Sequence, residues 1–111
     1  MDFSANALSG GIPKEVGDMR SLRLLDLSNN CLASIIPPSL GNLSNLAMLY
    51  LYSNQLVGTI PEELGVLSKL TVLQIPNNGL NGSIPASIAN LSSLVDLRLF
   101  NNSLNSSIPP Q

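Results

Sequence analysis

Few residues of this 111-residue chain have side chains that could do catalytic or metal chemistry, and their spacing assembles no site. The sequence has no histidine, which excludes an imidazole base and the usual Cys/His zinc ligands. Its one cysteine, Cys31, has no second cysteine with which to form an internal disulfide. Glu62 and Glu63 are the only adjacent carboxylates, and we expect a solvated loop there rather than acid/base catalysis. The sequence therefore predicts a protein that is not an enzyme, with no catalytic residue, no metal and no cofactor.

N-linked glycosylation is a modification that the sequence does offer. Asn-x-Ser motifs are acceptors for such glycans in secreted proteins. The motifs begin at Asn42, Asn81, Asn90, Asn101 and Asn105. They are compatible with a secreted parent protein, and a glycan at Asn101 would border the binding face predicted below.

The charge pattern excludes several classes of partner. Five basic and seven acidic residues give a net charge of −2, and the basic residues are scattered. A nucleic-acid or anionic-membrane surface needs a basic patch, so neither partner is predicted. No apolar run approaches the roughly 18 residues of a membrane span, so we expect no membrane insertion. The first residues have neither a basic start nor an apolar stretch, so no signal peptide is predicted.

Asparagine recurs every 24 residues, and this period organises the chain. The column contains Asn6, Asn30, Asn54, Asn78 and Asn102. A leucine follows two residues after each asparagine, and an Ile-Pro pair follows six residues after it. A fixed period of this length is typical of a solenoid, in which each unit buries its apolar face against its neighbours. We therefore predict a single domain over residues 1–111 with about four and a half repeats.

Each repeat has residues suited to a strand, a turn and a short arc. The alternation Leu25-x-Leu27 predicts a strand with inward leucines, and successive strands should form a parallel sheet. A buried turn leaves backbone groups that need partners, and the asparagine amide can bond the turn and the next coil. Loss of one such asparagine should cost about 1–3 kcal/mol. The Ile-Pro pair favours the start of an irregular or short helical segment.

The pattern L-x-x-L-x-L-x-x-N-x-L-x-G-x-I-P resembles the plant-type leucine-rich repeat over the whole chain. Ser34 and Ser106 replace its glycine. The resemblance implies an α/β solenoid: a right-handed curved superhelix with short parallel strands on the concave side, irregular or 3-10 convex arcs and a second short sheet. Relatives include extracellular or cell-surface ectodomains of plant receptor-like kinases and secreted inhibitors of fungal polygalacturonases. They bind peptides, steroids or proteins on the concave face.

The chain departs from the resembled family at both ends. Complete ectodomains have cysteine-paired caps, and neither an N-terminal nor a C-terminal cap is present in the sequence. We expect a piece of a longer array or a short product derived from one. Uncapped ends expose apolar side chains and strand edges, which makes self-association one expectation.

Outward positions of the predicted strands form columns, and the variable ones are candidates for ligand binding. Aromatic residues and arginine are enriched at binding hot spots. We predict a protein or peptide site made of Asp26, Tyr50, Tyr52, Gln74, Arg98 and Phe100. The alternative is that these residues form ordinary cross-strand pairs on an exposed sheet. Five strands span roughly 20 Å, enough for about six residues of extended peptide.

Three functions remain open at the level of sequence. The favoured one is a protein- or peptide-recognition module of a plant receptor-like ectodomain in signalling or defence. The second is an inhibitor of a secreted pathogen hydrolase, and the third is an ice-binding repeat protein. Ice binding would use regular polar columns, of which Ala5, Asn29, Ser53, Asn77 and Asn101 form the candidate.

Overall fold

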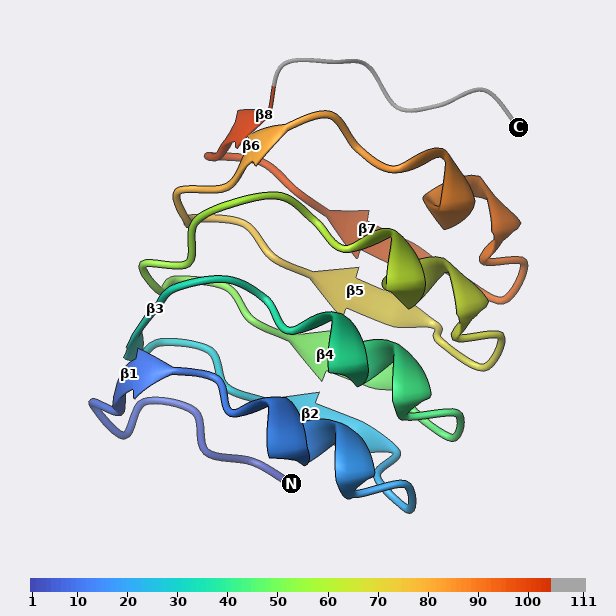
Figure 1. Ribbon diagram of the computed structural model, residues 1–111, viewed down its shortest axis with the longest axis horizontal. Coiled ribbons are helices and arrows are strands. Elements are labelled where there is room, and N and C mark those ends of the chain that lie inside the picture. Colours follow the sequence, from blue (N-terminus) through green and yellow to red (C-terminus); the bar gives the residue numbers. More distant parts are fainter. Residues whose placement is uncertain (105–111) are drawn as a thin grey trace.

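Four parallel strands stacked side by side form the main sheet of the computed structural model, which describes residues 1–104 (Figure 1). In spatial order these are β2 (Leu24–Asp26), β4 (Met48–Tyr50), β5 (Val72–Gln74) and β7 (Asp96–Arg98). The first coil adds a single bridge between Asp2 and Asp26 instead of the fifth full strand that we expected. The predicted stack of parallel strands is otherwise present.

The register of the main sheet follows the sequence period without slippage. Leu25 pairs with Leu49, and Leu49 with Leu73. Paired residues are thus 24 positions apart, so each repeat position forms a straight row across the sheet. The central residue of β2, β4 and β5 is fully buried, and the residues on either side point outward, as the alternation of a strand requires.

A second set of strands forms two separate pairs along one edge of the molecule. β1 (Ser9–Gly11) pairs with β3 (Cys31–Ala33), and β6 (Asn81–Gly82) pairs with β8 (Ser103–Leu104). Backbone hydrogen bonds continue between the pairs, because the amides of Gln55 and Gly79 donate to carbonyls one coil earlier at 2.7 Å. The second short sheet that the resemblance implied is therefore present as a row of backbone hydrogen bonds between coils. Within residues 1–104, only its two ends form paired strands.

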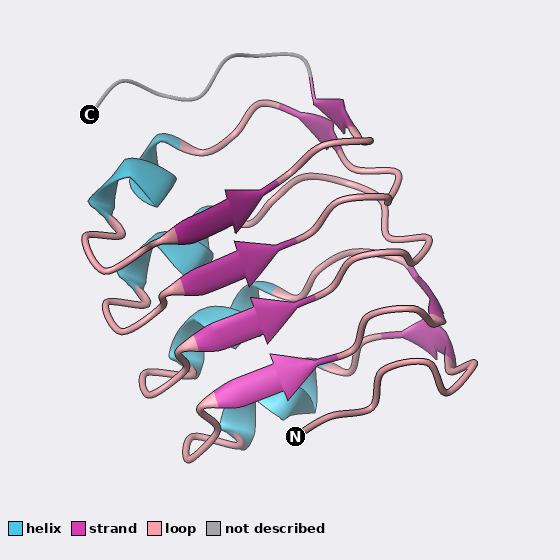
Figure 2. Cartoon of the chain, turned by 180° about the vertical axis from the view of Figure 1, so that it is seen from behind, coloured by secondary structure: helices cyan, strands magenta, loops and turns pink. Residues whose placement is uncertain are grey.

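Four 3-10 helices cover the opposite side of the solenoid from the main sheet (Figure 2). They are η1 (Lys14–Asp18), η2 (Pro38–Asn42), η3 (Glu62–Val66) and η4 (Ala86–Asn90). Each follows a proline of the Ile-Pro pair, whose φ between −60° and −65° is suited to entering a helical turn. No α-helix occurs within residues 1–104, so these short arcs are the only helices described.

Glycines let these helices approach one another closely. A Cβ added at Gly41 would lie 2.6 Å from the carbonyl oxygen of Glu63, closer than real Cβ contacts permit. Gly17 and Gly65 face the following helix equally closely. The hydroxyl of Ser87 also donates to the carbonyl of Glu62 at 2.7 Å. Close backbone contact at these glycines, without an intervening side chain, therefore sets the distance between successive 3-10 helices.

The core is a continuous column of leucine and isoleucine between the main sheet and the helices. Most of its leucines in the second to fourth coils are inaccessible to solvent. The first coil differs: Phe3 is 43% exposed and Leu8 is 37% exposed, although the repeat predicts burial at both, since they occupy the positions of the inward Leu27 and of Leu32. The expectation of burial is wrong at these two positions, because a neighbouring coil covers them on one side only.

The chain changes direction after each main-sheet strand through one residue in the left-handed region. This position is held by Ala5, Asn29, Ser53, Asn77 and Asn101, with φ between 55° and 60°. A second left-handed position is held by Gly10, Gly58 and Gly82, with φ between 74° and 80°. Ser34 occupies that glycine column at φ 67° and is strained, since non-glycine residues disfavour this region.

Candidate functional site

The outward side of the main sheet, here called the sheet face, carries most of the predicted site residues. Asp26, Tyr50, Gln74 and Arg98 are paired in register, so they form one row across four adjacent strands. The row is polar and varied, whereas the neighbouring inward row is entirely leucine. The sequence period thus places these side chains in line, as the prediction required.

Two tyrosines form an aromatic pair near the middle of the sheet face. The rings of Tyr50 and Tyr52 have centroids 6.4 Å apart and are nearly perpendicular, an edge-to-face arrangement. The Tyr50 hydroxyl also contacts the Met48 sulfur at 3.8 Å. Both tyrosines are partly buried, so part of each side chain remains open to solvent.

Asp96 connects two of the predicted residues and was missing from the prediction. Its Oδ2 accepts a 3.0 Å hydrogen bond from the Gln74 amide, and its Oδ1 accepts one of 3.0 Å from Arg98 Nε. A partly exposed ion pair of this kind contributes little to stability, so its main effect is to orient the guanidinium. The link to Gln74 depends on pairing between β5 and β7, so it does not follow from the spacing within one repeat.

Arg98 keeps donors available for a ligand. Its side chain is 54% exposed, and only Nε is engaged by Asp96. Its two terminal nitrogens have no hydrogen-bond partner within residues 1–104. Guanidinium nitrogens in this geometry bind a carboxylate in a bidentate manner. An oriented, half-exposed arginine with unpaired terminal nitrogens can therefore anchor an acidic group.

Phe100 and Asp26, at the two ends of the predicted site, are not linked to its other residues by side-chain hydrogen bonds within residues 1–104. Phe100 is 57% exposed and follows β7, and the ring contact between Tyr50 and Tyr52 does not include it. Asp26 is occupied locally, because its Oδ1 accepts the amide and hydroxyl hydrogens of Ser28 at 3.0 and 2.6 Å. Asp2 and Ser4 repeat this arrangement, which lowers the pKa of the Asp2 carboxyl through hydrogen bonds from the Ser4 hydroxyl and amide.

One predicted outward column is only partly outward, the one made of Ser4, Ser28, Tyr52, Pro76 and Phe100. Ser28 is fully buried and Pro76 is also buried, whereas Phe100 in the same column is exposed. The expectation that the whole column faces solvent is wrong. The column lies just after the strands, where the backbone already bends toward the interior. The short Ser28 side chain folds back onto Asp26, and Pro76 lies on the coil between those of Tyr52 and Phe100.

The asparagine ladder joins each coil to the coil before it. Asn54 Nδ2 donates to the Leu51 and Tyr52 carbonyls of its own turn at 3.1 and 3.3 Å, and to the Leu27 carbonyl at 3.0 Å. Its Oδ1 accepts from the Leu32 amide at 3.0 Å. Asn30, Asn78 and Asn102 repeat this pattern.

The direction of the ladder corrects one expectation. We predicted bonds from each asparagine to the next coil, and these side chains instead bond the preceding coil. Asn6 therefore differs from the other four. Its side chain makes one bond among the described residues, to the Ser4 carbonyl at 3.1 Å, and it is exposed. The same residue type at the same repeat position thus has different surroundings in the first coil.

A second row of polar side chains runs beside the ladder, with Asn77 and Asn101 exposed and Ser53 partly buried. Asn101 Nδ2 donates to Asn77 Oδ1 at 2.8 Å, and Asn77 Nδ2 donates to Ser53 Oγ at 3.4 Å. These residues occupy the left-handed turn position described above. The row belongs to the column considered for ice binding, and it is continuous over three coils.

The predicted glycosylation sites that the structure describes, and the one cysteine, lie at the surface. Asn42, Asn81, Asn90 and Asn101 are exposed, so their sequons are accessible, and Asn105 lies outside the described residues. Cys31 is a free, exposed thiol. Within residues 1–104 no group of three or more His, Cys, Asp or Glu side chains could hold a metal ion. In the same part of the chain, no helix has the length and apolarity to cross a membrane.

Comparisons with known proteins point to one family. Residues 2–56 match the family described as leucine rich repeat, and residues 69–91 match a second description of the same repeat. No curated protein was found to match the chain. Several solved structures are similar, and three of them are informative about function.

The first is the ectodomain of the plant membrane receptor kinase GASSHO1/SCHENGEN3 from Arabidopsis thaliana, in complex with CASPARIAN STRIP INTEGRITY FACTOR 2. It is 45% identical with a TM-score of 0.85, over 86% of this chain and 12% of that chain. The plant peptide hormone receptor RGFR1 in complex with RGF2 is 47% identical with a TM-score of 0.90, over 92% of this chain and 16% of that one. A plant ice-binding protein is 39% identical with a TM-score of 0.80, over 88% and 32%.

Proposed function

The chain belongs to the leucine-rich repeat family, and from this premise we propose that its sheet face binds an extended peptide or protein segment. The observation that carries the proposal is Arg98, which Asp96 orients while its terminal nitrogens remain unpaired within residues 1–104. Similar structures include a receptor kinase ectodomain and a peptide hormone receptor, each solved in complex with a partner, which supports a recognition role for this kind of solenoid. The chain spans less than a fifth of those two receptors.

The side chains suggest how such a segment would bind. Arg98 would pair with a carboxylate of the ligand, either an acidic side chain or a C-terminus. Tyr52 and Phe100 would contact apolar side chains, since aromatic residues supply much of the energy at interfaces. Gln74 donates to Asp96 through its amide nitrogen, so its amide oxygen is oriented to accept a hydrogen bond from a ligand backbone.

The expected affinity is modest. Four strands and a bridged first coil span roughly 20 Å, which accommodates about six residues of extended peptide. Specific protein interfaces usually bury more than about 1,000 Å² in total. The isolated chain should therefore bind weakly, and a longer array of coils around the same residues would bind more tightly.

A peptide-display selection against the whole chain, followed by affinity measurement, tests the proposal. Selected peptides should be enriched in an acidic residue beside apolar ones, and Arg98→Gln should weaken binding about tenfold or more. Val95→Ser is the matched control, because Val95 is highly exposed, lies next to the same strand and is not among the site residues. The proposal fails if Arg98→Gln and the double change of Tyr52 and Phe100 to serine leave the affinity unchanged.

By analogy with the similar receptors, we place the role of the chain outside the cell, within a receptor-like recognition system for signalling or defence. The mixed charges of the sheet face, Asp26 and Asp96 against Arg98, give no support to a surface specialised for one basic hydrolase. Secretion of the protein through a plant secretory pathway with glycans at Asn42 or Asn90 would support this placement. Retention of an unmodified chain in the cytosol would contradict it.

Ice binding is the second candidate, and one observation favours it. The polar row Ser53, Asn77 and Asn101 is continuous, and a plant ice-binding protein is 39% identical to this chain. The row covers three coils, a short surface for such a function. Measurement of ice-recrystallisation inhibition decides the matter: inhibition that disappears in Asn77→Leu would support this function, and inactivity of the wild-type protein would exclude it.

We also propose that two copies associate through the first coil. An apolar hollow of about 320 Å³ opens there beside Met1, Phe3 and Leu8. Burial of the exposed part of Phe3 and Leu8 against a second copy would remove apolar surface from water. Analytical ultracentrifugation should show concentration-dependent dimers that Phe3→Ser weakens, and a strictly monomeric wild-type protein would contradict the proposal.

A further inference from the structure

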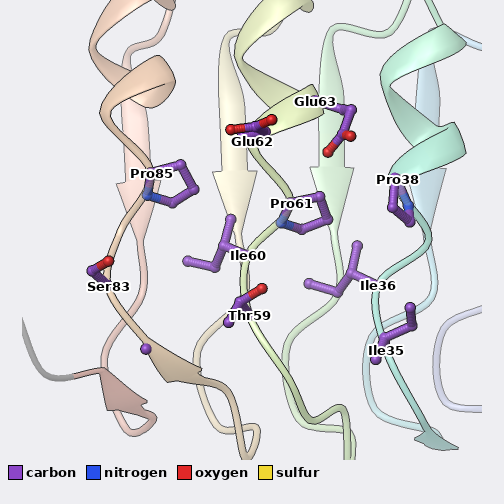
Figure 3. Close-up of a pocket in the computed structure, with 11 residues that line it drawn as sticks. Ile35, Ile36, Pro38, Thr59, Ile60, Pro61, Glu62, Glu63, Ser83 and Pro85 are labelled. Atoms are coloured by element: carbon purple, nitrogen blue, oxygen red, sulfur yellow. The ribbon is translucent and has the colours of Figure 1, made fainter.

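A groove crosses three coils between the second-strand edge and the helices, away from the sheet face (Figure 3). Its volume is about 530 Å³, within the usual range of roughly 300–1,000 Å³ for ligand sites. Its lining comes from equivalent segments of three successive repeats. The residues that matter most are Ile35, Thr59, Ile60, Glu62, Glu63 and Gly82.

Glycines hollow out the second-strand end of this groove. A Cβ added at Gly82 would lie 3.0 Å from the Thr59 side chain, and one at Gly58 would lie 3.0 Å from the Ile35 side chain. These side chains of one coil therefore extend over the glycine of the next coil. Ile35 and Thr59 therefore form one wall of the groove, and the buried Ile60 lies at its base.

The two ends of the groove have opposite chemistry. Ile35 is 51% exposed, a large aliphatic side chain left open to solvent at the second-strand end. Glu62 and Glu63 lie at the helix end, beyond a row of prolines, as Figure 3 shows. Neither carboxylate has an ion pair or side-chain hydrogen bond with any residue in 1–104, and no lysine or arginine lines the groove.

We propose that this groove binds a short extended segment of a partner protein that presents a lysine or arginine beside an aliphatic residue. The cation would pair with Glu62 and Glu63, and the aliphatic side chain would cover Ile35. Charge complementarity selects this occupant, because two unpaired carboxylates are the only charged groups in the lining. The site is separate from the sheet face and does not depend on the function proposed for that face.

The dimensions limit the occupant to a few residues. Three coils at about 4.8 Å apart span roughly 10 Å, which corresponds to about three residues of extended chain. Such a contact is small, so this groove should act as an auxiliary site that adds specificity to a larger interface. Its electrostatic part should weaken as salt rises, because both carboxylates are exposed.

Titration of the complete ¹⁵N-labelled chain with the peptide acetyl-Leu-Arg-Leu-amide tests the inference. Amide shifts should concentrate at Ile35, Thr59 and Glu62–Glu63 and should leave Tyr50 and Phe100 unchanged. The double variant Glu62→Gln with Glu63→Gln should weaken binding about fivefold or more, and Ile35→Ser should weaken it through the apolar end. Glu15→Gln is the matched control, since Glu15 occupies the repeat position of Glu63 on η1, outside the groove.

Three results would overturn the inference. One is the absence of shifts at millimolar peptide, and a second is equal binding of acetyl-Leu-Glu-Leu-amide. The third is a shift pattern centred on the sheet face, which would assign the peptide to that surface instead. Circular dichroism of each variant shows whether it is folded, and binding that survives both Gln substitutions in a folded protein also counts against the proposal.

Discussion

Two asparagine columns run side by side through the chain, and they have opposite roles. Asn30 is buried and its amide bonds three carbonyls and two amide groups of the backbone. Asn29, its neighbour, is exposed and occupies the left-handed turn at φ 55°. Asn78 and Asn77 repeat the contrast two coils later.

Asparagines at adjacent positions of the repeat therefore serve different purposes. The inner one is needed for its side-chain hydrogen bonds, and the outer one for the backbone conformation it adopts. In the inner column the amide is required, because it pairs backbone groups that water reaches poorly. In the outer column the backbone conformation is what matters, because asparagine tolerates the left-handed region better than most residues. Accordingly, the inner column is invariant along the chain, while the outer column also contains Ala5 and Ser53.

The largest expected effect comes from removing an inner asparagine. Asn54→Ala leaves the Leu32 amide without its partner and removes one of the two amide donors to the Leu27 carbonyl, so the free energy of unfolding should fall by about 3 kcal/mol. Urea denaturation followed by circular dichroism measures the change. A loss equal to or smaller than that of the outer-column variant below would erase the distinction between the columns.

An outer asparagine should matter less, and through the backbone. Asn77→Ala places alanine at φ 60°, which should cost about 1 kcal/mol. Asn77→Gly separates the causes, because glycine adopts this conformation freely and also lacks the side chain. If the glycine variant is as unstable as the alanine variant, the hydrogen bonds to Ser53 and Asn101 are responsible instead, and the contrast with the inner column is weaker.

The outer column also predicts a gain. Ser53 is a poor residue for φ 57°, and asparagine at this position would match Asn29, Asn77 and Asn101. Ser53→Asn should therefore raise the free energy of unfolding by about 0.5 kcal/mol. The midpoint of the urea transition is the measurement, and a decrease would show that the turn conformation does not control this column.

The smallest effect is expected at the exposed end of the inner column. Asn6 makes one side-chain bond, to Ser4, and has no coil before it in the structure. Asn6→Ala should change stability by less than about 0.5 kcal/mol. Matched hydrogen-exchange measurements of Asn6→Ala and Asn54→Ala would show whether the cost depends on the preceding coil, and comparable losses of protection would contradict that dependence.

The period made most of the fold predictable. The 24-residue spacing placed the parallel strands, the buried leucines and the arcs after Ile-Pro, because a repeat leaves little freedom in register. It also placed Tyr50, Gln74 and Arg98 in one row of the sheet face. The direction of the ladder was not predictable, since the asparagine spacing is the same whichever neighbour is bonded.

The parts that escaped prediction depend on contacts between repeats. Asp96 links Gln74 and Arg98 through distances that only the stacked coils create. The burial of Pro76 depends on the bend that follows the strand. The groove near Ile35 arises where one repeat's side chain extends over the glycine of the next, a relation that no single repeat contains.

The one-way ladder has a consequence for how such genes change length. Each inner asparagine bonds only its own turn and the coil before it, so every unit offers its successor the same set of backbone groups. Unequal recombination that adds or deletes 24 codons would therefore join coils through contacts already present in the protein. A deletion of 23 codons would leave one coil of 25 residues and disrupt the rung at that junction, so only changes by whole repeats preserve the complete ladder.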